Sequence, residues 1–332
     1  MLNSSSSKFA VLVFARRLSS SRLGAGVVDW SKPGQILSVE AKHSYRKNGF
    51  LLVRNVLSKS DIQFFTDRFL ALCERKITPP TGMLIMKDVS IAKKETPDSV
   101  DTITKVQDFT EDELFKYCEH ENITKIVRDL IGTPATNLQA MHTMLINKPP
   151  DTGSLTSRHP MHQDAYYFNW EPQDLTCCAW TAMEKVTQKN GCLQVVAGSH
   201  RNGLQPHAYP EWEGGVNKAY YAIKDYDMSL RRQYVEMNPG DTVFFHPYLY
   251  HGSGANRSGG FRKAISCHYA NYDECRYFDA KGTLLEEAEK EIIEIMKKNP
   301  KRYKLAEGQK LNFERFWRNR SAPVGHSGRE NL

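Results

Sequence analysis

The stretch from about Leu138 to Cys275 constrains the fold most, because it is a series of short β-branched and aromatic runs separated by turn signals. Runs of this kind predict strands, and the Gly-, Pro- and Asn-rich segments between them predict tight connections. Many short strands joined by turns favour a jelly roll or a barrel over a doubly wound sheet. The strands we expect are 140–147, 175–184, 192–197, 233–237, 242–246 and 262–269.

Helices are expected on the N-terminal side of this β region. Apolar residues recur every three or four positions after Ser58 and Ser60, and either serine can cap a helix that starts near Asp61. The other elements expected before the β region are a strand at 49–54 and helices at 111–118 and 122–131.

A further helix is expected after the β region. Thr283 followed three residues later by Glu286 is the pattern of a capping box, and the helix should run to about Lys298. Its basic last turn suits the helix dipole. Residues 29–332 are therefore expected to form a single domain, with a β core over about 138–275 and helices on both sides.

Composition and charge exclude several classes of protein. No apolar run among the 332 residues approaches the roughly 18 that a membrane-spanning helix needs, so we expect no membrane span. The net charge is +7, and four of these charges lie in residues 1–28, so the remainder is too weakly basic to indicate nucleic-acid binding. The seven cysteines are odd in number and form no Cys-x-x-Cys motif, which predicts reduced thiols.

Residues 1–28 form a distinct segment that is rich in Ser and Arg and contains no acidic residue. This composition is typical of an organelle transit peptide. A disordered tail is the alternative interpretation.

The most specific local motif is His162-Gln-Asp164. In an extended segment residues i and i+2 point to the same side, so this imidazole and carboxylate can face one point. Two ligands hold a metal weakly. A second histidine would complete the facial triad of non-haem iron(II) oxygenases, which keeps coordination positions open for substrate and oxygen.

The second histidine has to come from a later strand, and His246, His251 and His268 are available. His207 lies in a polar loop and suits a metal ligand poorly. Arg262 favours His251, because a 2-oxo acid bound to the metal leaves its far carboxylate in need of a cation, and a guanidinium pairs bidentately with a carboxylate. We expect a strand with His251, a turn and a return strand with Arg262 to place the two side by side.

Other chemistries lack their motifs. The sequence has no His-Glu-x-x-His zinc motif, no nucleophile elbow and no phosphate-binding P-loop. Met144 and Trp180 lie on expected strands, where they could line a pocket or belong to the core.

Several segments together resemble the phytanoyl-CoA dioxygenase family of iron(II)- and 2-oxoglutarate-dependent oxygenases. The resemblance runs from about Arg46 to about Tyr277. The segments that carry it are Ile103-Thr-Lys-Val-Gln-Asp-Phe109, Ala140-Met-His-Thr-Met-Leu-Ile-Asn-Lys-Pro-Pro150, Arg158-His-Pro-Met-His-Gln-Asp164, Trp212-Glu-Gly-Gly-Val-Asn-Lys218, Gly240-Asp-Thr-Val-Phe-Phe-His-Pro247 and Gly260-Phe-Arg-Lys-Ala-Ile-Ser-Cys-His268.

This resemblance implies a double-stranded β-helix (jelly roll) that hydroxylates C2 of phytanoyl-CoA or a related 3-methyl-branched acyl-CoA, as in fatty acid alpha-oxidation. It implies Fe(2+), 2-oxoglutarate and O2, with ascorbate as a supporting reductant. The implied metal ligands are His162, Asp164 and His251. The implied 2-oxoglutarate-binding residues are Arg262 and Ser253 at the far carboxylate, with Lys105, Met144 and Trp180 lining the site.

Two alternatives stay open. One is an oxygenase of the same type with a different substrate, and the other is a non-catalytic acyl-CoA-binding module on the same fold. The resemblance implies a peroxisome and an import receptor, but the N-terminal import signal departs from the family pattern. Arg17-Leu18 is followed at the decisive positions by Gly24 and Ala25, where the family has His or Gln and then Leu. The mitochondrial matrix is therefore the alternative location.

Overall fold

The computed structural model describes residues 27–30, 35–88, 91, 97–153, 155, 157–212, 216–303, 308 and 310–325. The expected N-terminal targeting segment lies outside these residues except for Val27 and Val28, which begin the first strand. Among the helices that the structure describes, none combines the length and the apolar character needed to cross a bilayer.

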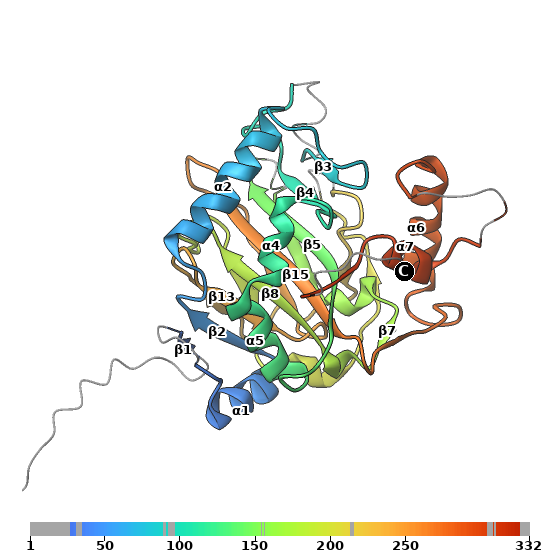
Figure 1. The fold of residues 1–332 in the computed structure, drawn as a ribbon. Helices are drawn as coiled ribbons and strands as arrows, with labels where there is room; N and C mark the ends of the chain where they lie inside the picture. The colour runs from blue at the N-terminus through green and yellow to red at the C-terminus, as the bar shows by residue number, and fades with distance from the viewer. Residues whose placement is uncertain are drawn as a thin grey trace, which may run out of the picture.

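The core is a jelly roll of two sheets, antiparallel except for one parallel pair at an edge of the larger sheet. Figure 1 shows the strands of the larger sheet. The six strands expected in the β region are all present, and four of them belong to the larger sheet. This sheet has the order β1 (Val27–Asp29), β2 (Phe50–Arg54), β13 (Thr242–Phe245), β8 (Thr176–Ala182), β15 (Arg262–Asn271), β5 (Leu138–Lys148), β4 (Lys105–Gln107) and β3 (Leu84–Met86), and β17 (Ala322–Pro323) pairs with β5.

The smaller sheet carries the remaining two expected strands and lies on the opposite side of the roll. Its order is β12 (Gln233–Val235), β9 (Leu193–Val195), β14 (His251–Ser253) and β6 (His159–His162). Two short pairs complete the β structure: β10 (His207–Ala208) with β11 (Ala222–Ile223), and β7 (Trp170–Glu171) with β16 (Arg276–Tyr277).

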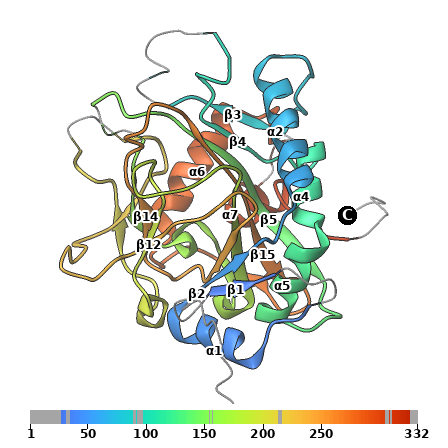
Figure 2. The same ribbon diagram turned by 90° about the vertical axis from the view of Figure 1, so that its left-hand side faces the viewer.

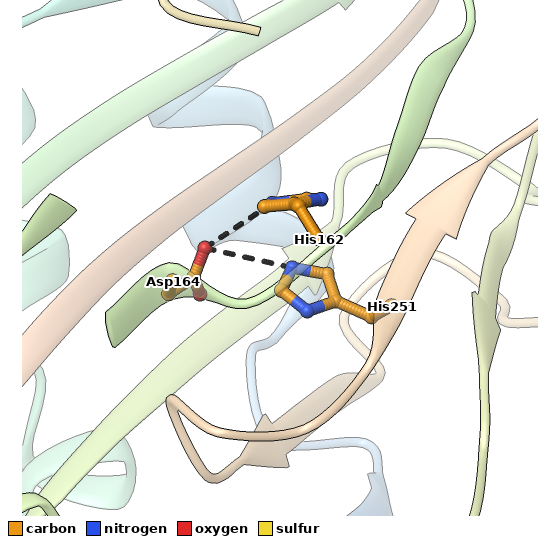
Figure 3. Close-up of side chains that lie close together, drawn as sticks. All are labelled: His162, Asp164 and His251. Carbon is orange, nitrogen blue, oxygen red and sulfur yellow. Dashed lines mark ion pairs between the residues drawn. The ribbon is translucent and has the colours of Figure 1, made fainter. Parts of the chain in front are cut away.

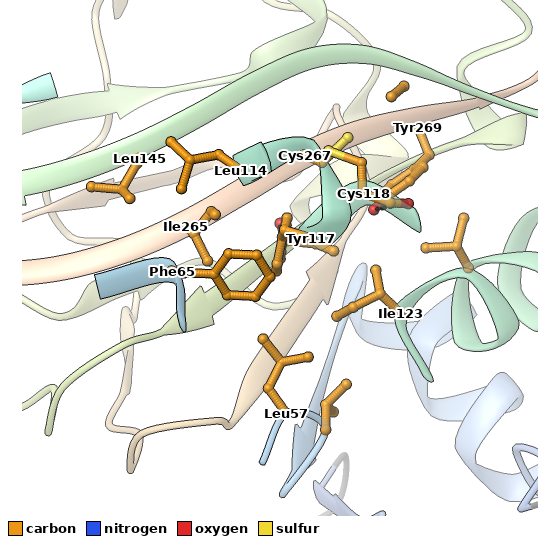
Figure 4. Close-up of a cluster of buried hydrophobic side chains, with 14 of the residues drawn as sticks. Leu57, Phe65, Leu114, Tyr117, Cys118, Ile123, Leu145, Ile265, Cys267 and Tyr269 are labelled. Carbon is orange, nitrogen blue, oxygen red and sulfur yellow. Dashed lines mark hydrogen bonds between the residues drawn. The ribbon is translucent and has the colours of Figure 1, made fainter. Parts of the chain in front are cut away.

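Side chains alternate between the two faces of the larger sheet, as a strand requires. On β8, Ala179 faces one hydrophobic cluster and Cys178 and Trp180 face another. The first cluster packs under the helices and includes Tyr117 and Ile265 (Figure 4). The second lies between the sheets. Figure 2 shows α2 (Lys59–Cys73), α4 (Lys116–Glu119) and α5 (Glu121–Ile131) on one side of the larger sheet and β12 and β14 on the other.

The helices over the first face follow the sequence prediction in two cases of three. Ser58 caps its helix, and Asp61 completes the capping box. The helix expected at 111–118 is divided, because the Asp112 side chain accepts the Leu114 N–H and starts a new turn there. The elements are α1 (Val39–Asn48), α2 (Lys59–Cys73), η1 (Glu113–Phe115), α4 (Lys116–Glu119) and α5 (Glu121–Ile131).

Two C-terminal helices, α6 (Glu286–Lys298) and α7 (Phe313–Arg318), cover the other side of the molecule. The capping box expected for α6 is wrong. Thr283 Oγ1 accepts the Leu285 N–H, and the Glu286 carboxylate accepts the Gly282 N–H. The chain makes an extra turn before the helix, so these two side chains stabilise that turn.

Candidate metal centre and active-site cavity

Three side chains from two distant segments of the sequence meet at the smaller sheet (Figure 3). His162 ends β6, His251 begins β14, and the two are register partners. Asp164 begins the 3-10 turn η2 (Asp164–Tyr167). Its Oδ1 lies 3.3 Å from His162 Nε2 and 3.6 Å from His251 Nε2. The three ligand atoms lie within 4.8 Å of one another, and all three residues are buried.

The extended backbone of Gln163 places His162 and Asp164 on one side, as the i, i+2 spacing predicts. Hydrogen bonds then fix this segment from three directions. The Gln163 side chain donates to the carbonyls of Gly203 and Tyr248, and its backbone N–H donates to His207 Nε2. His207 therefore holds the segment that carries two of the expected ligands.

Each histidine of the group keeps Nε2 free. His162 Nδ1 lies 2.8 Å from the Pro160 carbonyl oxygen, and His251 Nδ1 lies 3.0 Å from that of Leu249. Because a carbonyl only accepts, each Nδ1 carries the proton and each Nε2 offers a lone pair. Burial, together with the neighbouring His162, lowers the pKa of His251 to about 4, so that this imidazole is neutral near pH 7.

The carboxylate of Asp164 is held on its far side by His268. His268 Nε2 donates to Oδ2 at 2.8 Å, which leaves Oδ1 toward the two histidines. Burial alone would raise the pKa of Asp164. The nearby His251 and His268, with the hydrogen bond from His268, outweigh burial and keep the pKa well below its ordinary value. Two neutral nitrogens and one ionised oxygen are the donor set of the iron(II) facial triad.

The other two histidines considered from the sequence have different partners. His268 supports Asp164, and His246 Nε2 lies 2.9 Å from the exposed Asp174. Asp164, Cys178 and His268 also come close enough to hold a metal. Burial raises the pKa of the Cys178 thiol well above its ordinary value, and His268 Nε2 already donates a hydrogen bond, so this second group is a poorer ligand set.

All eight site residues expected from the sequence line one cavity of about 440 Å³. Arg262 lies deep in this cavity and is 2% exposed. Its Nη2 donates to the Gly191 carbonyl at 2.7 Å, whereas Nε and Nη1 have no hydrogen-bond partner among the described residues. Its guanidinium lies 5.2 Å from the ring centroid of Trp180. Burial lowers the pKa of Arg262 to about 10, which still leaves it charged near pH 7.

A buried guanidinium with two unused donors fits the far carboxylate of a 2-oxo acid, because an unpaired buried charge is costly and a carboxylate accepts two parallel N–H bonds. The route by which Arg262 reaches the site differs from the expectation. β14 pairs with β6 and β9, whereas β15 pairs with β5 and β8. His251 and Arg262 therefore lie on opposite sheets of the roll, and they line the same cavity from two sides.

Sequence reasoning missed Lys148, the register partner of Arg262. Its Nζ donates to Ser253 Oγ at 2.9 Å and to the Ser157 carbonyl. Burial and the nearby Arg262 lower its pKa well below the ordinary value for lysine. The signal in the sequence was its position at the end of a strand that pairs with the Arg262 strand.

The remaining two predicted residues lie on the edge of the larger sheet. Lys105 Nζ donates to the Tyr220 hydroxyl at 3.1 Å, and its ammonium lies 4.7 Å from the centroid of that ring. Met144 Sδ accepts from Gln107 Nε2 at 3.4 Å. Tyr220 comes from a loop far along the chain, and no local pattern identified it.

Comparison with known sequences gives consistent results. Residues 45–264 match the family model described as phytanoyl-CoA dioxygenase. A Caenorhabditis elegans protein named "Probable phytanoyl-CoA dioxygenase" is 57% identical over 312 residues, which cover 93% of this chain and 100% of that protein. The Homo sapiens "Phytanoyl-CoA dioxygenase, peroxisomal" is 50% identical over 282 residues, which cover 85% and 82%.

Solved structures share the fold at low sequence identity. The non-heme alpha ketoglutarate dependent carbocyclase SnoK from nogalamycin biosynthesis has a TM-score of 0.53 and 22% identity, covering 73% of this chain and 86% of that one. The epimerase SnoN, in complex with Fe3+, alpha ketoglutarate and nogalamycin RO, has a TM-score of 0.54 and 18% identity, covering 72% and 85%.

Proposed function

The chain belongs to the phytanoyl-CoA dioxygenase family, and from this we propose that it is an iron(II)- and 2-oxoglutarate-dependent oxygenase that hydroxylates C2 of phytanoyl-CoA or a related 3-methyl-branched acyl-CoA. One observation carries the proposal. A buried group of two histidines and one aspartate shares a cavity with a buried arginine that has two unused donors.

His162, Asp164 and His251 hold the metal in this proposal. When bound, iron(II) with 2-oxoglutarate and O2 supplies the oxidising chemistry, in which the oxo acid becomes succinate and CO2 and one oxygen atom enters a C–H bond. The protein contributes binding, orientation and exclusion of water. Arg262 binds the far carboxylate of 2-oxoglutarate bidentately, and Ser253 donates its hydroxyl to the same carboxylate.

Other cavity residues restrict how the cosubstrate lies. Lys148 donates to Ser253 Oγ and so leaves the serine hydroxyl proton free for the carboxylate. Trp180 covers the Arg262 side of the cavity, and Met144 and Lys105 line it from the neighbouring strands β5 and β4.

Succinate release tests the proposal. The purified protein is incubated with iron(II), 2-oxoglutarate, ascorbate and phytanoyl-CoA, and succinate and 2-hydroxyphytanoyl-CoA are measured. We expect both products in equal amounts, with Asp164→Ala as the inactive control. Phytanic acid as the free acid should give far less product than the thioester.

Two results would point elsewhere. Succinate release that depends on iron but never on a branched acyl-CoA would indicate an oxygenase with another substrate. Binding of acyl-CoA without succinate release under any of these conditions would indicate a binding module.

We propose a peroxisomal location, because relatives about half identical to this chain carry "peroxisomal" in their names. Import through a peroxisomal receptor is tested by fusing residues 1–28, or the chain from residue 29, to a fluorescent protein. The proposal is supported if the fusion of residues 1–28 is peroxisomal and the fusion of the chain from residue 29 is not. Mitochondrial fluorescence of the fusion of residues 1–28 overturns it.

A further inference from the structure

One face of α6 lines the active-site cavity, and the side chains on this face change in character along the helix. The lining residues recur every three or four positions and continue just past the helix end: Ala288, Ile292, Ile295, Lys298 and Arg302. This spacing places them along one face. Apart from Glu291, this face is apolar in its first turns, and it is cationic at its end.

The cations at this end of the cavity have no acidic partner. Among the described residues, Lys298 and Arg302 form no ion pair, and neither does Lys218, which lines the cavity from the loop after Trp212. Other cations of the region are paired. Lys297 Nζ lies 2.7 Å from Glu294, on the exposed side of the same helix turn.

Two further charged groups of the cavity are already engaged. Arg320 Nε lies 2.7 Å from Asp108 in a buried pair. Glu291, which also lies on the lining face of α6, accepts hydrogen bonds from the Tyr209 and Tyr221 hydroxyls.

Arg262, Lys148 and Lys105 also lack an acidic partner among the described residues, and their polar contacts are with Gly191, Ser157, Ser253 and Tyr220. Lys298 and Arg302 form a second group of cavity-lining cations without an ion pair, at the C-terminal end of α6.

A helix C-terminus carries partial negative charge, which by itself attracts lysines and repels anions. Lys297 already provides a cation for this end of the helix on the exposed side. Lys298 and Lys218 are exposed and Arg302 is half-buried, so these cations line the cavity where it is open to solvent. Cations in such a place, beside an apolar face, suit an amphiphile with an anionic head. Lysine binds phosphate as a point charge, and arginine binds it bidentately.

We propose that Lys298 and Arg302, with the cavity-lining Lys218, bind the phosphate groups of the CoA thioester, and that the apolar residues from Ala288 to Ile295 lie beside the part of the substrate that leads from these phosphates to the metal ligands. This inference rests on the proposed function, since it locates the binding site for the CoA part of the same substrate. It explains why a thioester of CoA, and not the free acid, would be the better substrate.

Charge reversal tests the site with a matched control on the same helix turn. Lys298→Glu places an acid at the proposed phosphate site, and Lys297→Glu places one on the exposed side. Binding of free CoA to the full-length protein without iron is measured by calorimetry. We expect Lys298→Glu to weaken CoA binding at least tenfold and Lys297→Glu to change it less than twofold.

Turnover gives a second readout. S-phytanoyl-pantetheine carries the same thioester without phosphates. Lys298→Glu should raise the KM for phytanoyl-CoA about tenfold and leave the KM for S-phytanoyl-pantetheine and for 2-oxoglutarate unchanged. Arg302→Gln, which removes charge without adding an acid near Asp108, should act in the same direction. Thermal unfolding of each variant checks the fold, and Lys298→Gln replaces Lys298→Glu if the latter melts early.

Equal CoA affinity in wild type, Lys298→Glu and Arg302→Gln overturns the site. So does an equal loss of affinity in Lys298→Glu and Lys297→Glu, because that result reports only overall charge. These outcomes are separate from the failure of the proposed function, which would be the absence of succinate release by the wild-type protein even though CoA binds.

Discussion

The two oxygens of the Asp164 carboxylate have different partners, and His268 is the reason. Because His268 Nε2 donates to Oδ2, Oδ1 is the oxygen turned toward the two histidines. Partners of this kind orient a ligating carboxylate and commonly change metal affinity by about 10- to 100-fold. His268 is a positioning residue in this interpretation.

We predict that His268→Ala weakens iron(II) binding about tenfold or more, whereas His268→Gln, whose amide can still donate, retains most of the affinity. Mn(II) binding followed by electron paramagnetic resonance measures this without turnover. At saturating iron, the kcat of His268→Ala should be close to that of the wild-type protein. Its kcat/KM for iron should stay well below the wild-type value. Equal Mn(II) affinities in the two variants would contradict the positioning role.

Arg262 provides a second prediction at the level of single residues. Arg262→Lys keeps a positive charge but cannot bind a carboxylate bidentately. We expect the KM for 2-oxoglutarate to rise about 10- to 100-fold, with a smaller change in kcat, because one charge-assisted hydrogen bond is worth roughly 1.5–3 kcal/mol. Steady-state succinate release at varied 2-oxoglutarate measures the change, and an unaltered KM would identify a different cation as the anchor.

At the level of elements, the turn that ends at Gly191 supports the cosubstrate end of the cavity. Gly191 has φ +78°, and a Cβ there would lie 2.6 Å from the Gly254 carbonyl oxygen and 2.6 Å from Lys148 Cε. Its carbonyl also receives the Arg262 hydrogen bond. The turn therefore lies against both Arg262 and Lys148.

Gly191→Ala should destabilise the protein by about 1–2 kcal/mol from the left-handed backbone alone, and should also raise the KM for 2-oxoglutarate. Gly282→Ala is the matched control, because Gly282 has φ +75° and no atom within 4 Å of its would-be Cβ. It should lose comparable stability without changing that KM. Urea denaturation and steady-state kinetics measure the two effects, and a KM that is the same in both variants would refute the support role.

Elements defined by local patterns were predictable, and contacts between distant elements were not. The strands around Trp180 and Arg262 follow from β-branched runs, and the Ser58 cap follows from a local hydrogen bond. The metal group was predictable because His162 and Asp164 are two residues apart and Arg262 identified His251. The assignment of β14 and β15 to opposite sheets depends on pairing between distant strands, which turn signals do not determine.

Lys148 and His268 were missed for a related physical reason. A lysine or histidine in a strand is recognised as functional only when its partners are known, and Ser253 and Asp164 come from the opposite side of the roll. Family resemblance, and no physical pattern, identified Lys105 and Ser253.

At the level of the whole molecule, protonation of His207 should make the folding stability depend on pH. Burial lowers the pKa of His207 to about 4, and its Nε2 accepts the Gln163 N–H. The unfolded chain has a histidine pKa near 6.5. Between these values the unfolded state binds a proton that the folded state does not, so stability falls as the pH falls from about 6.5 to 4.

We predict that the metal-free protein loses on the order of 2 kcal/mol through this residue across that window. His207→Gln, whose amide oxygen can accept the same N–H, should be less sensitive to acid. Urea denaturation at several pH values measures both proteins. Identical pH dependence in the two would show that other groups are responsible.

The pairing of His162 with His251 across β6 and β14 makes metal uptake a check on assembly. A slip of either strand by one residue would turn one imidazole to the far side of the sheet, even though the backbone ladder could still form. Misassembled chains would then be iron-free while remaining β-rich. The fraction of molecules in a preparation that bind iron therefore measures the fraction in which β6 and β14 are paired in the native register.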